Sequence, residues 1–133
     1  MIDKVGLLLI RDHKLLLCRK ARGTQFLILP GGKREAGESS LECLARELHE
    51  ELGDVEAIAP EFVGVYQHVA AGEAGKHVRI ELYRAELTGS PSAQSEIAEL
   101  VWFSPQGDWS TVSPSIAEKI LPDLIARGIL IGK

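Results

Sequence analysis

Residues 29–54 read LPGGKREAGESSLECLARELHEELGD, and this stretch decides the fold of the chain. It divides into a glycine-rich loop and a predicted helix. Ser39 is a favourable N-cap, and Glu42 three residues later completes a capping box, so the helix is expected to begin near Ser40. Gly53 supplies the C-terminal stop. Both ends of the helix are therefore specified by local sequence.

The predicted helix has two chemically different faces. At about 100° per residue, its aliphatic residues gather on one narrow face that is expected to pack on the core. These residues are Leu41, Leu44, Ala45, Leu48 and Leu52. On the same count, Glu47, Glu50 and Glu51 gather on the opposite side, within an arc of roughly 100°. One face is therefore expected in the core, and the other carries three carboxylates.

The carboxylate face is unfavourable for the stability of an isolated helix. Like charges three or four residues apart cost about 0.2–0.5 kcal/mol each, and negative charge in the last turns opposes the helix dipole. Arg46 is the only Lys or Arg in the predicted helix. A solvated acidic face is one interpretation of this pattern. The other is a cation site, because Mg²⁺ prefers oxygen ligands from a few carboxylates together with substrate phosphate.

The spacing of seven residues in this stretch resembles the signature box of the Nudix hydrolase superfamily. They are Gly32, Glu38, Arg46, Glu47, Glu50, Glu51 and Gly53, with Leu48 where the family has an aliphatic residue. The box covers 23 of the 133 residues, and its one departure is Asp54, where the family usually has an aliphatic residue. A match at seven spaced positions is far more specific than a lone glycine motif.

The resemblance implies an α/β fold, in which a mixed and partly parallel β-sheet is sandwiched between helices. The short chain is similar to MutT-like members and is expected to form one domain over residues 1–133. The implied reaction is hydrolysis of a pyrophosphate bond in a nucleoside diphosphate linked to another group X. Its products are a nucleoside monophosphate and the phosphorylated group.

The resemblance also assigns roles to residues of the box. It implies that Glu47, Glu50 and Glu51 bind Mg²⁺, for which Mn²⁺ can substitute, and that water is activated there. Arg46 is expected to pair with a box glutamate and to hold it in place. Glu38 is expected to brace the loop or to meet the metal through water. The expected catalytic set is therefore Glu50, Glu51, Arg46 and Glu38.

The general base stays open at this stage, because the family uses either a box glutamate or a carboxylate from another loop. Glu96 and Glu99 are the candidates outside the box, although charged residues on a surface turn are equally common. His68 and His77 bracket residues 70–76, which read as a flexible loop, and both could approach a phosphate. A lone histidine is more often a surface or hydrogen-bonded residue.

Substrate contacts are expected from the glycine-rich loop and from aromatic rings. Gly32 allows close approach of the backbone to a ligand. A nucleobase is expected to stack on Phe26, Tyr66 or Trp102, as bases do on aromatic faces. The plainer interpretation is that these rings belong to the core. The sequence does not identify the base or the group X.

Composition narrows the class of protein. With 133 residues, 45% of them hydrophobic, the chain can form a substantial core. A net charge of −4 without a basic stripe argues against a stable nucleic-acid partner, and two cysteines are too few for a disulfide scaffold. No apolar run approaches a membrane span, and no signal peptide is evident. We therefore expect a cytoplasmic monomer or homodimer that acts on a small-molecule nucleotide.

The remaining sequence predicts strands and a second helix. The predicted strands are residues 5–10, 14–19, 26–29, 57–69 with a break near Pro60, 77–87 and 100–103. The second helix is expected to open at Ser113-Pro114, to be kinked or broken at Pro122, and to end at Gly128.

Two other functions are compatible with parts of this pattern. A binding module on the same fold would sense a nucleotide without turnover, but such a sensor would not need three clustered glutamates. The second alternative is a structural domain whose acidic helix face is simply exposed to solvent. Hydrolysis is the interpretation that uses every feature of the box.

Overall fold

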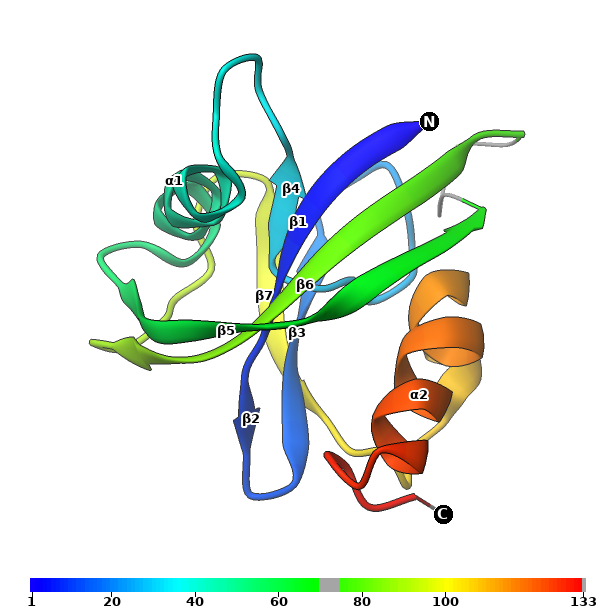
Figure 1. The fold of residues 1–133 in the computed structure, drawn as a ribbon. Coiled ribbons are helices and arrows are strands. Elements are labelled where there is room, and N and C mark those ends of the chain that lie inside the picture. Colours follow the sequence, from blue (N-terminus) through cyan, green and yellow to red (C-terminus); the bar gives the residue numbers. More distant parts are fainter. Residues whose placement is uncertain (70–74, 133) are drawn as a thin grey trace.

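The computed structural model describes residues 1–69 and 75–132. Within these residues the chain forms two β-sheets, a short 3₁₀ helix (Trp109–Thr111) and two longer helical segments (Figure 1). The strands are β1 (Ile2–Leu8), β2 (Ile10–Arg11), β3 (Lys14–Lys20), β4 (Gly31–Lys33), β5 (Glu56–Val69), β6 (His77–Thr88) and β7 (Ile97–Phe103). The helices are α1 (Ser40–Leu52) and α2 (Leu121–Ala126), and a π-helical turn (Ile116–Ile120) leads into α2.

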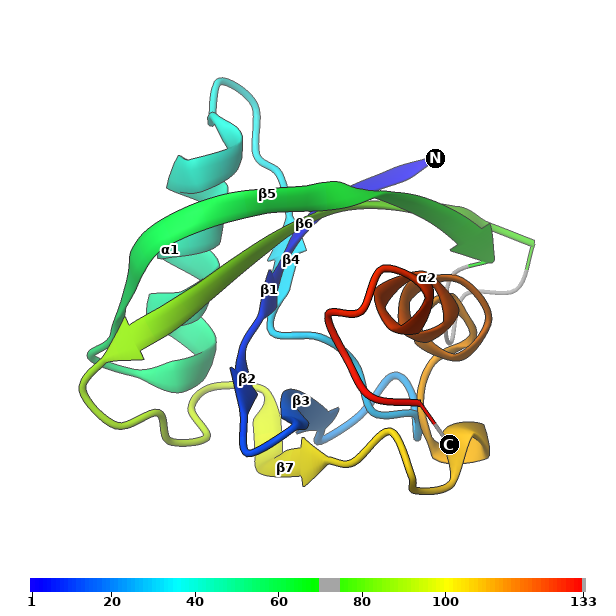
Figure 2. The same ribbon diagram turned by 60° about the horizontal axis from the view of Figure 1, so that its bottom comes forward.

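The larger sheet has the strand order β4-β1-β6-β5. β1 runs parallel to β6 and antiparallel to β4, and β5 runs antiparallel to β6. Figure 2 shows α1 and α2 on opposite sides of β1 and β6. The predicted α/β fold, with a mixed and partly parallel sheet between helices, is confirmed. The smaller sheet is antiparallel, with the order β2-β3-β7.

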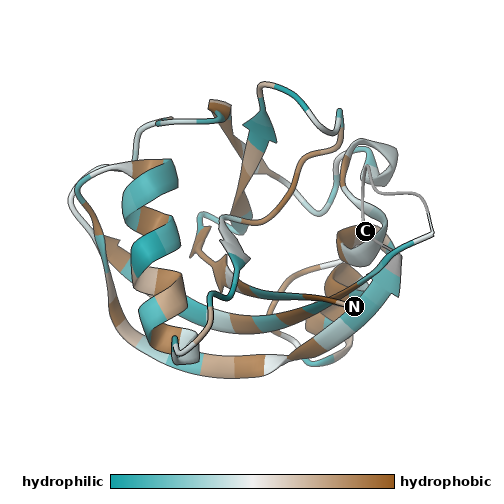
Figure 3. Cartoon of the chain, turned by 90° about the horizontal axis from the view of Figure 1, so that it is seen from above, coloured by the Kyte–Doolittle hydropathy of each residue, from teal (hydrophilic) through white to brown (hydrophobic). Residues whose placement is uncertain are grey.

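The core is divided between the two faces of β1. Val5 and Leu7 are fully buried in the cluster that includes Leu48 of α1, whereas Leu8 is fully buried in the cluster that includes Leu121 of α2. Each fully buried side chain of this size contributes about 1.5–3 kcal/mol of burial free energy. In Figure 3, α1 carries both hydrophobic and hydrophilic stretches, as expected for a helix with one buried face. No helix of the described part of the chain is both long and apolar enough to span a membrane.

The predicted strand at residues 26–29 is wrong. Leu27 forms an isolated bridge with Val112, and Ile28 forms one with Cys18, so neighbouring residues pair with different partners and build no continuous ladder. The strand lies instead at Gly31–Lys33, which pairs with β1. Glycine has a low intrinsic preference for strands, and tertiary pairing overrides that preference here.

The predicted break near Pro60 is a local irregularity within one strand. β5 continues from Glu56 to Val69, but its register with β6 shifts between Ile58 and Glu61. Ala59 has a φ of 45°, which is typical of a bulge that bends a strand without ending it. Most of the predicted loop at 70–76 lies outside the described residues.

The second helix is not broken at Pro122, since the π-helical turn (Ile116–Ile120) continues directly into α2 (Leu121–Ala126), which contains the proline near its start. The Leu121 N–H donates to the Ile116 carbonyl, which is the spacing of a π-helix. Pro122 itself has no N–H to donate, and the wider turn precedes it directly. Gly128, with a φ of 74°, follows the end of the helix.

The predicted apolar face of α1 is partly wrong. Leu41 is 47% exposed, and Ala45 is exposed as well. Cys43 is fully buried instead, because β4 and the loop after it fold over that side of the helix, with the Cys43 sulfur 3.5 Å from the Lys33 carbonyl oxygen. The buried arc of α1 is therefore rotated toward its glutamates.

Candidate active site

The helix that carries the glutamates has the predicted caps. The Ser39 hydroxyl accepts from the Glu42 N–H at 3.1 Å, and the Glu42 carboxylate accepts from the Ser39 N–H at 2.9 Å. Gly53 follows the helix with a φ of 90°. The capping box and the glycine stop are confirmed, and they fix the register in which the glutamates leave the helix.

The glycine-rich strand lies directly against two of these glutamates. The Gly31 N–H donates to Glu51 Oε1 at 2.8 Å. A Cβ atom at Gly32 would lie 2.4 Å from the carboxyl carbon of Glu47. The wheel count places the carboxylates on a face opposite the core. In the structure, β4 covers part of that face, so it is not fully solvated. Only Glu50 is open to solvent, with its side chain 55% exposed against 14% for Glu47.

Arg46 joins the loop to the helix glutamates. Its guanidinium lies 2.6 Å from Glu38 Oε2, 2.9 Å from Glu47 Oε1 and 3.3 Å from Glu50 Oε1. Arg46 Nη2 also donates to the Lys33 carbonyl at 2.9 Å. The hydrogen bond from Arg46 and a second one from the Glu35 N–H lower the pKa of Glu38 to about 2. The expected ion pair of Arg46 with a box glutamate is present, and it includes three of them.

Glu51 and Glu47 are carboxylates in an environment that disfavours their charge. Burial raises the pKa of Glu51 to about 7, although the Gly31 N–H opposes this shift, and the nearby Glu47 adds to it. Burial also raises the pKa of Glu47, against the effect of Arg46. Two crowded carboxylates of this kind are stabilised in the charged form by a neighbouring cation.

These groups line one cleft, which we call the carboxylate cleft. Its volume is about 310 Å³, and charged residues from five segments of the chain surround it. They are Glu47, Glu50 and Glu51 of α1, Lys4 of β1, Lys20 of β3, Lys33 of β4, and Glu96. Of the two outside candidates for the general base, the structure brings Glu96 to this cleft. Glu99 instead forms an ion pair with Arg19 at 2.6 Å.

The donor set of the cleft fits a hard divalent cation. It offers carboxylate oxygens, which are ligands that Mg²⁺ and Mn²⁺ prefer, and a bound cation would offset the repulsion among these carboxylates. Among the described residues, no three His, Cys, Asp or Glu side chains already converge as a metal site. One carboxylate oxygen of Glu47 and one of Glu50, Oε1 in each case, contact Arg46.

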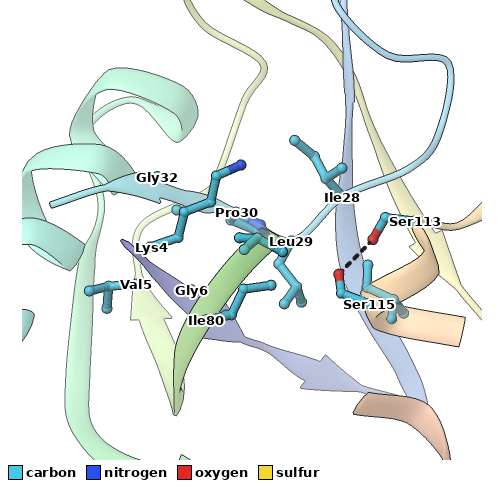
Figure 4. A pocket seen from close by; sticks show the side chains of 13 residues that line it. Lys4, Val5, Gly6, Ile28, Leu29, Pro30, Gly32, Ile80, Ser113 and Ser115 are labelled. Atoms are coloured by element: carbon cyan, nitrogen blue, oxygen red, sulfur yellow. Dashed lines mark hydrogen bonds between the residues drawn. The ribbon is translucent and has the colours of Figure 1, made fainter. Parts of the chain in front are cut away.

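A smaller apolar cavity adjoins the carboxylate cleft (Figure 4). Its volume is about 50 Å³, and it shares Lys4, Gly31 and Gly32 with the cleft. Ile28, Leu29, Ile80 and Ile116 contribute apolar walls. The buried hydroxyls of Ser113 and Ser115 lie side by side at this cavity, with their oxygens 3.1 Å apart.

The structure does not bring the predicted stacking rings to either cavity. Tyr66 is 9% exposed in the core, and its hydroxyl donates to Asp123 at 2.5 Å. Phe26 is half-buried and lines neither the carboxylate cleft nor the apolar cavity. Trp102 lies beneath the Arg11 guanidinium, 5.6 Å from the ring centroid. The positions of these rings therefore do not support the prediction that a nucleobase stacks on them.

The two histidines that bracket the loop do not line the cleft either. His68 lies 2.8 Å from Glu118 of the π-helical turn. His77 lies beside Met1 and Ile2 at a separate depression.

Four residues that line the two cavities are not predicted from the sequence: Lys4, Lys20, Ser113 and Ser115. Their positions in the site follow from strand pairing and helix placement, for which their local sequences carry no signal.

The buried position of Glu51 predicts a pH dependence of folding stability. Its pKa is about 7 in the folded protein, against an ordinary value of 4.5. Between these values the unfolded chain loses the proton first, so metal-free protein is expected to lose up to about 3 kcal/mol of stability from this group as pH rises from 4.5 to 7. Melting temperatures measured in chelator should show this loss in wild type and not in Glu51→Gln.

The difference between the two proteins reports on Glu51 together with its interaction with Glu47, whose pKa is also raised. The pKa values of Glu38, Glu42 and Glu81 are lowered, so these groups titrate below this window. A melting-temperature difference between wild type and Glu51→Gln that stays constant across the window would contradict the prediction.

Comparison with known proteins identifies relatives over most of the chain. A family model described as NUDIX domain matches residues 2–120. A protein of Escherichia coli (strain K12) named CTP pyrophosphohydrolase is 36% identical over 110 residues, which cover 80% of this chain and 78% of that protein.

Solved structures agree with this result. The solution structure of the E. coli ORF135 protein is 29% identical and has a TM-score of 0.77, covering 100% of this chain and 95% of its own. The crystal structure of a MutT NUDIX hydrolase from Burkholderia pseudomallei has the same TM-score of 0.77 at 24% identity, covering 92% of this chain and 95% of its own. The second likeness concerns the fold alone.

Proposed function

This chain belongs to the Nudix hydrolase family, and from that premise we propose that it is a Mg²⁺-dependent nucleotide pyrophosphohydrolase whose metal ligands are Glu47, Glu50 and Glu51. As a Nudix pyrophosphohydrolase, it acts on nucleoside diphosphate derivatives. The observation that carries the proposed ligand set is the partly buried pair of Glu47 and Glu51 against Gly31 and Gly32.

A divalent cation at these glutamates, Mg²⁺ or Mn²⁺, would supply a Lewis acid for phosphoryl oxygens and lower the pKa of attacking water. The residues of the chain provide the geometry. The Gly31 N–H fixes one oxygen of Glu51, and Arg46 holds Glu47 and Glu50. In this proposal Arg46 and Glu38 act through the ligand glutamates and do not touch the substrate.

The lysines of the carboxylate cleft are placed to bind the phosphate chain. Lys4, Lys20 and Lys33 approach from three different strands and line the same cleft as the ligand glutamates. Lys4 and Lys33 are direct partners in the pairing of β1 with β4. Directly opposite residues of an antiparallel pair place their side chains on the same face of the sheet, and both lysines line the cleft.

The nucleoside end of the substrate is proposed to lie over the opening of the apolar cavity, because a volume of about 50 Å³ does not hold a complete nucleoside. This cavity adjoins the cleft through Gly31, Gly32 and Lys4, so a ligand with its phosphates in the cleft can extend over its opening. Gly32 keeps its substrate-contact role in this proposal, whereas Phe26 and Tyr66 have no part in it. Because the E. coli relative is named a CTP pyrophosphohydrolase, CTP is the first substrate to test.

The general base is proposed to be a carboxylate of the cleft. Glu96 lines the cleft together with the ligand glutamates, whereas Glu99 forms its ion pair elsewhere. The choice is therefore between a box glutamate and Glu96. Glu96→Gln separates them, because loss of a general base costs typically 10²–10⁴-fold in rate.

A substrate panel tests the proposed reaction. CTP, the other nucleoside triphosphates, ADP-ribose, nucleotide sugars and dinucleoside polyphosphates should be incubated with Mg²⁺, Mn²⁺ or chelator, and the products separated by chromatography. We expect metal-dependent release of a nucleoside monophosphate from a preferred substrate. If no substrate is hydrolysed with either metal while nucleotide binding is measurable, the protein is a nucleotide sensor on this fold.

A further inference from the structure

Arg34 connects the glycine-rich loop to three other elements. Its guanidinium lies 3.2 Å from Asp3 of β1 and 3.2 Å from Glu81 of β6, and it donates to the Ser40 hydroxyl of α1 at 2.9 Å. The Arg34 backbone N–H donates to the Asp3 carbonyl at 3.0 Å. The Arg34 side chain is only 22% exposed. One arginine therefore ties the loop, the sheet and the start of α1 together.

Glu81 is the acceptor at the centre of this network. Its carboxylate accepts from Arg34, from the Ser40 hydroxyl and from the Tyr83 hydroxyl, and its side chain is 15% exposed. Burial alone would raise the pKa of Glu81, but the hydrogen bonds from Ser40 and Arg34 keep it below its usual value. A partly buried carboxylate with this many donors holds them in one arrangement.

The network is linked to the carboxylate cleft by a short series of contacts. Arg34 Nη1 lies 3.5 Å from the Glu38 carbonyl oxygen. The Glu38 carboxylate in turn accepts from Arg46 at 2.6 Å and 2.9 Å. Arg46 then holds Glu47 at 2.9 Å and Glu50 at 3.3 Å. Every step from the sheet to the proposed ligands is a polar contact between charged or backbone groups.

We propose that Arg34 and Glu81 are positioning residues for the hydrolytic reaction. They fix the loop of residues 34–39 on β1 and β6, and through Glu38 and Arg46 they set the orientation of Glu47 and Glu50. This inference rests on the proposed function of the cleft. It assigns a role in that reaction to two residues that touch neither substrate nor metal.

A matched ion pair elsewhere in the chain provides the control. Arg11 and Glu86 also form an arginine–glutamate contact between two strands, at 2.5 Å, but their side chains are 39% and 51% exposed. Neither residue lines the carboxylate cleft. Exposed pairs of this kind contribute little to stability, so Arg11→Met and Glu86→Gln test the loss of an ion pair without loss of loop anchoring.

The experiment compares kcat, the KM for nucleotide and the Mg²⁺ dependence of Arg34→Met, Glu81→Gln, the double variant and the two controls. All assays are run well below the melting temperature of each variant. We expect kcat to fall about 10-fold or more in Arg34→Met and Glu81→Gln, because small misplacements of catalytic groups cost 10- to 10²-fold. The KM should change less than about 3-fold, since the lysines of the cleft remain. The controls should match wild type.

The double variant and a conservative variant complete the test. Because Arg34 and Glu81 act through one network, the double variant should be no slower than the slower single variant by more than about 2-fold. Arg34→Lys keeps the charge but lacks the planar fork, and it should recover only part of kcat. An active wild type with unchanged kcat in Arg34→Met and Glu81→Gln overturns the positioning role alone, whereas an inactive wild type overturns the proposed function and this inference together.

Discussion

Glu51→Gln is expected to lower turnover by at least 10²-fold and to leave the fold intact. Glutamine keeps the size of the side chain and can still accept the hydrogen bond from the Gly31 N–H, which lies 2.8 Å from Glu51 Oε1. What it removes is the negative charge of a proposed metal ligand. Loss of one positioned electrostatic group costs typically 10²–10³-fold in kcat. Steady-state assays at saturating Mg²⁺, with circular dichroism as the folding check, measure this effect.

Glu99→Gln is the matched control for this substitution. Glu99 is exposed, forms an ion pair with Arg19 and does not line the carboxylate cleft. Its turnover should stay within about 2-fold of wild type, because exposed pairs have little effect beyond their own contact. Equal turnover of Glu51→Gln and wild type would show that the ligand set is misassigned.

Gly31→Ala and Gly32→Ala are expected to damage different properties of the protein, although they are neighbours. At Gly31, φ is 133° and an added Cβ would lie 2.1 Å from the Val5 carbonyl oxygen, so alanine forces backbone atoms apart. We expect destabilisation of roughly 3 kcal/mol or more. At Gly32 the added Cβ would lie 2.4 Å from the movable carboxyl group of Glu47. There the carboxylate can rotate away, and we expect kcat to fall 10-fold or more with a small loss of stability.

Thermal melts and kinetics on both variants separate these two effects. Gly37→Ala serves as the comparison, because φ there is 82° but nothing lies within 4 Å of an added Cβ. It should show the conformational strain of a positive φ without a steric clash. The interpretation of Gly32 fails if Gly32→Ala keeps full activity, or if its stability falls as far as that of Gly31→Ala.

The ends of α1 are predictable from sequence because they depend on local hydrogen bonds. Ser39 and Glu42 satisfy each other's backbone groups within four residues of chain, and no tertiary partner is required for that. The spacing of the box is equally local. The mixed sheet follows only from the family resemblance, because residue periodicity does not specify strand order.

The orientation of α1 is where local reasoning fails. A helical wheel places Leu41 on the buried face, but this side chain is 47% exposed, whereas Cys43 is fully buried. The difference arises because β4 covers the side of the helix that carries Cys43 and Glu47. The prediction of a strand at residues 26–29 fails for a related reason, since Leu27 and Ile28 pair with different neighbours.

The candidate site likewise combines residues that are predictable from local sequence with residues that only the fold brings together. The glutamates and Arg46 belong to one helix and are visible in the sequence as a spaced pattern. Lys4 and Lys20 come from β1 and β3, and only the folded sheets bring them to the same cleft. The choice of Glu96 over Glu99 likewise depends on where the turn before β7 lies, because only two residues separate these similar side chains.

The parallel pairing of β1 with β6 determines the order in which this cleft can form. Nearly all of its charged groups lie within the first 51 residues, yet β1 is completed on its second edge by Val78 and the residues that follow. Contacts between such distant segments form late, because a long loop must close first. A nascent chain that ends at residue 54 contains the whole signature box, but it lacks β6, with which β1 pairs in the larger sheet. The chemistry encoded early in the chain is therefore available only after β6 has been synthesised and has docked.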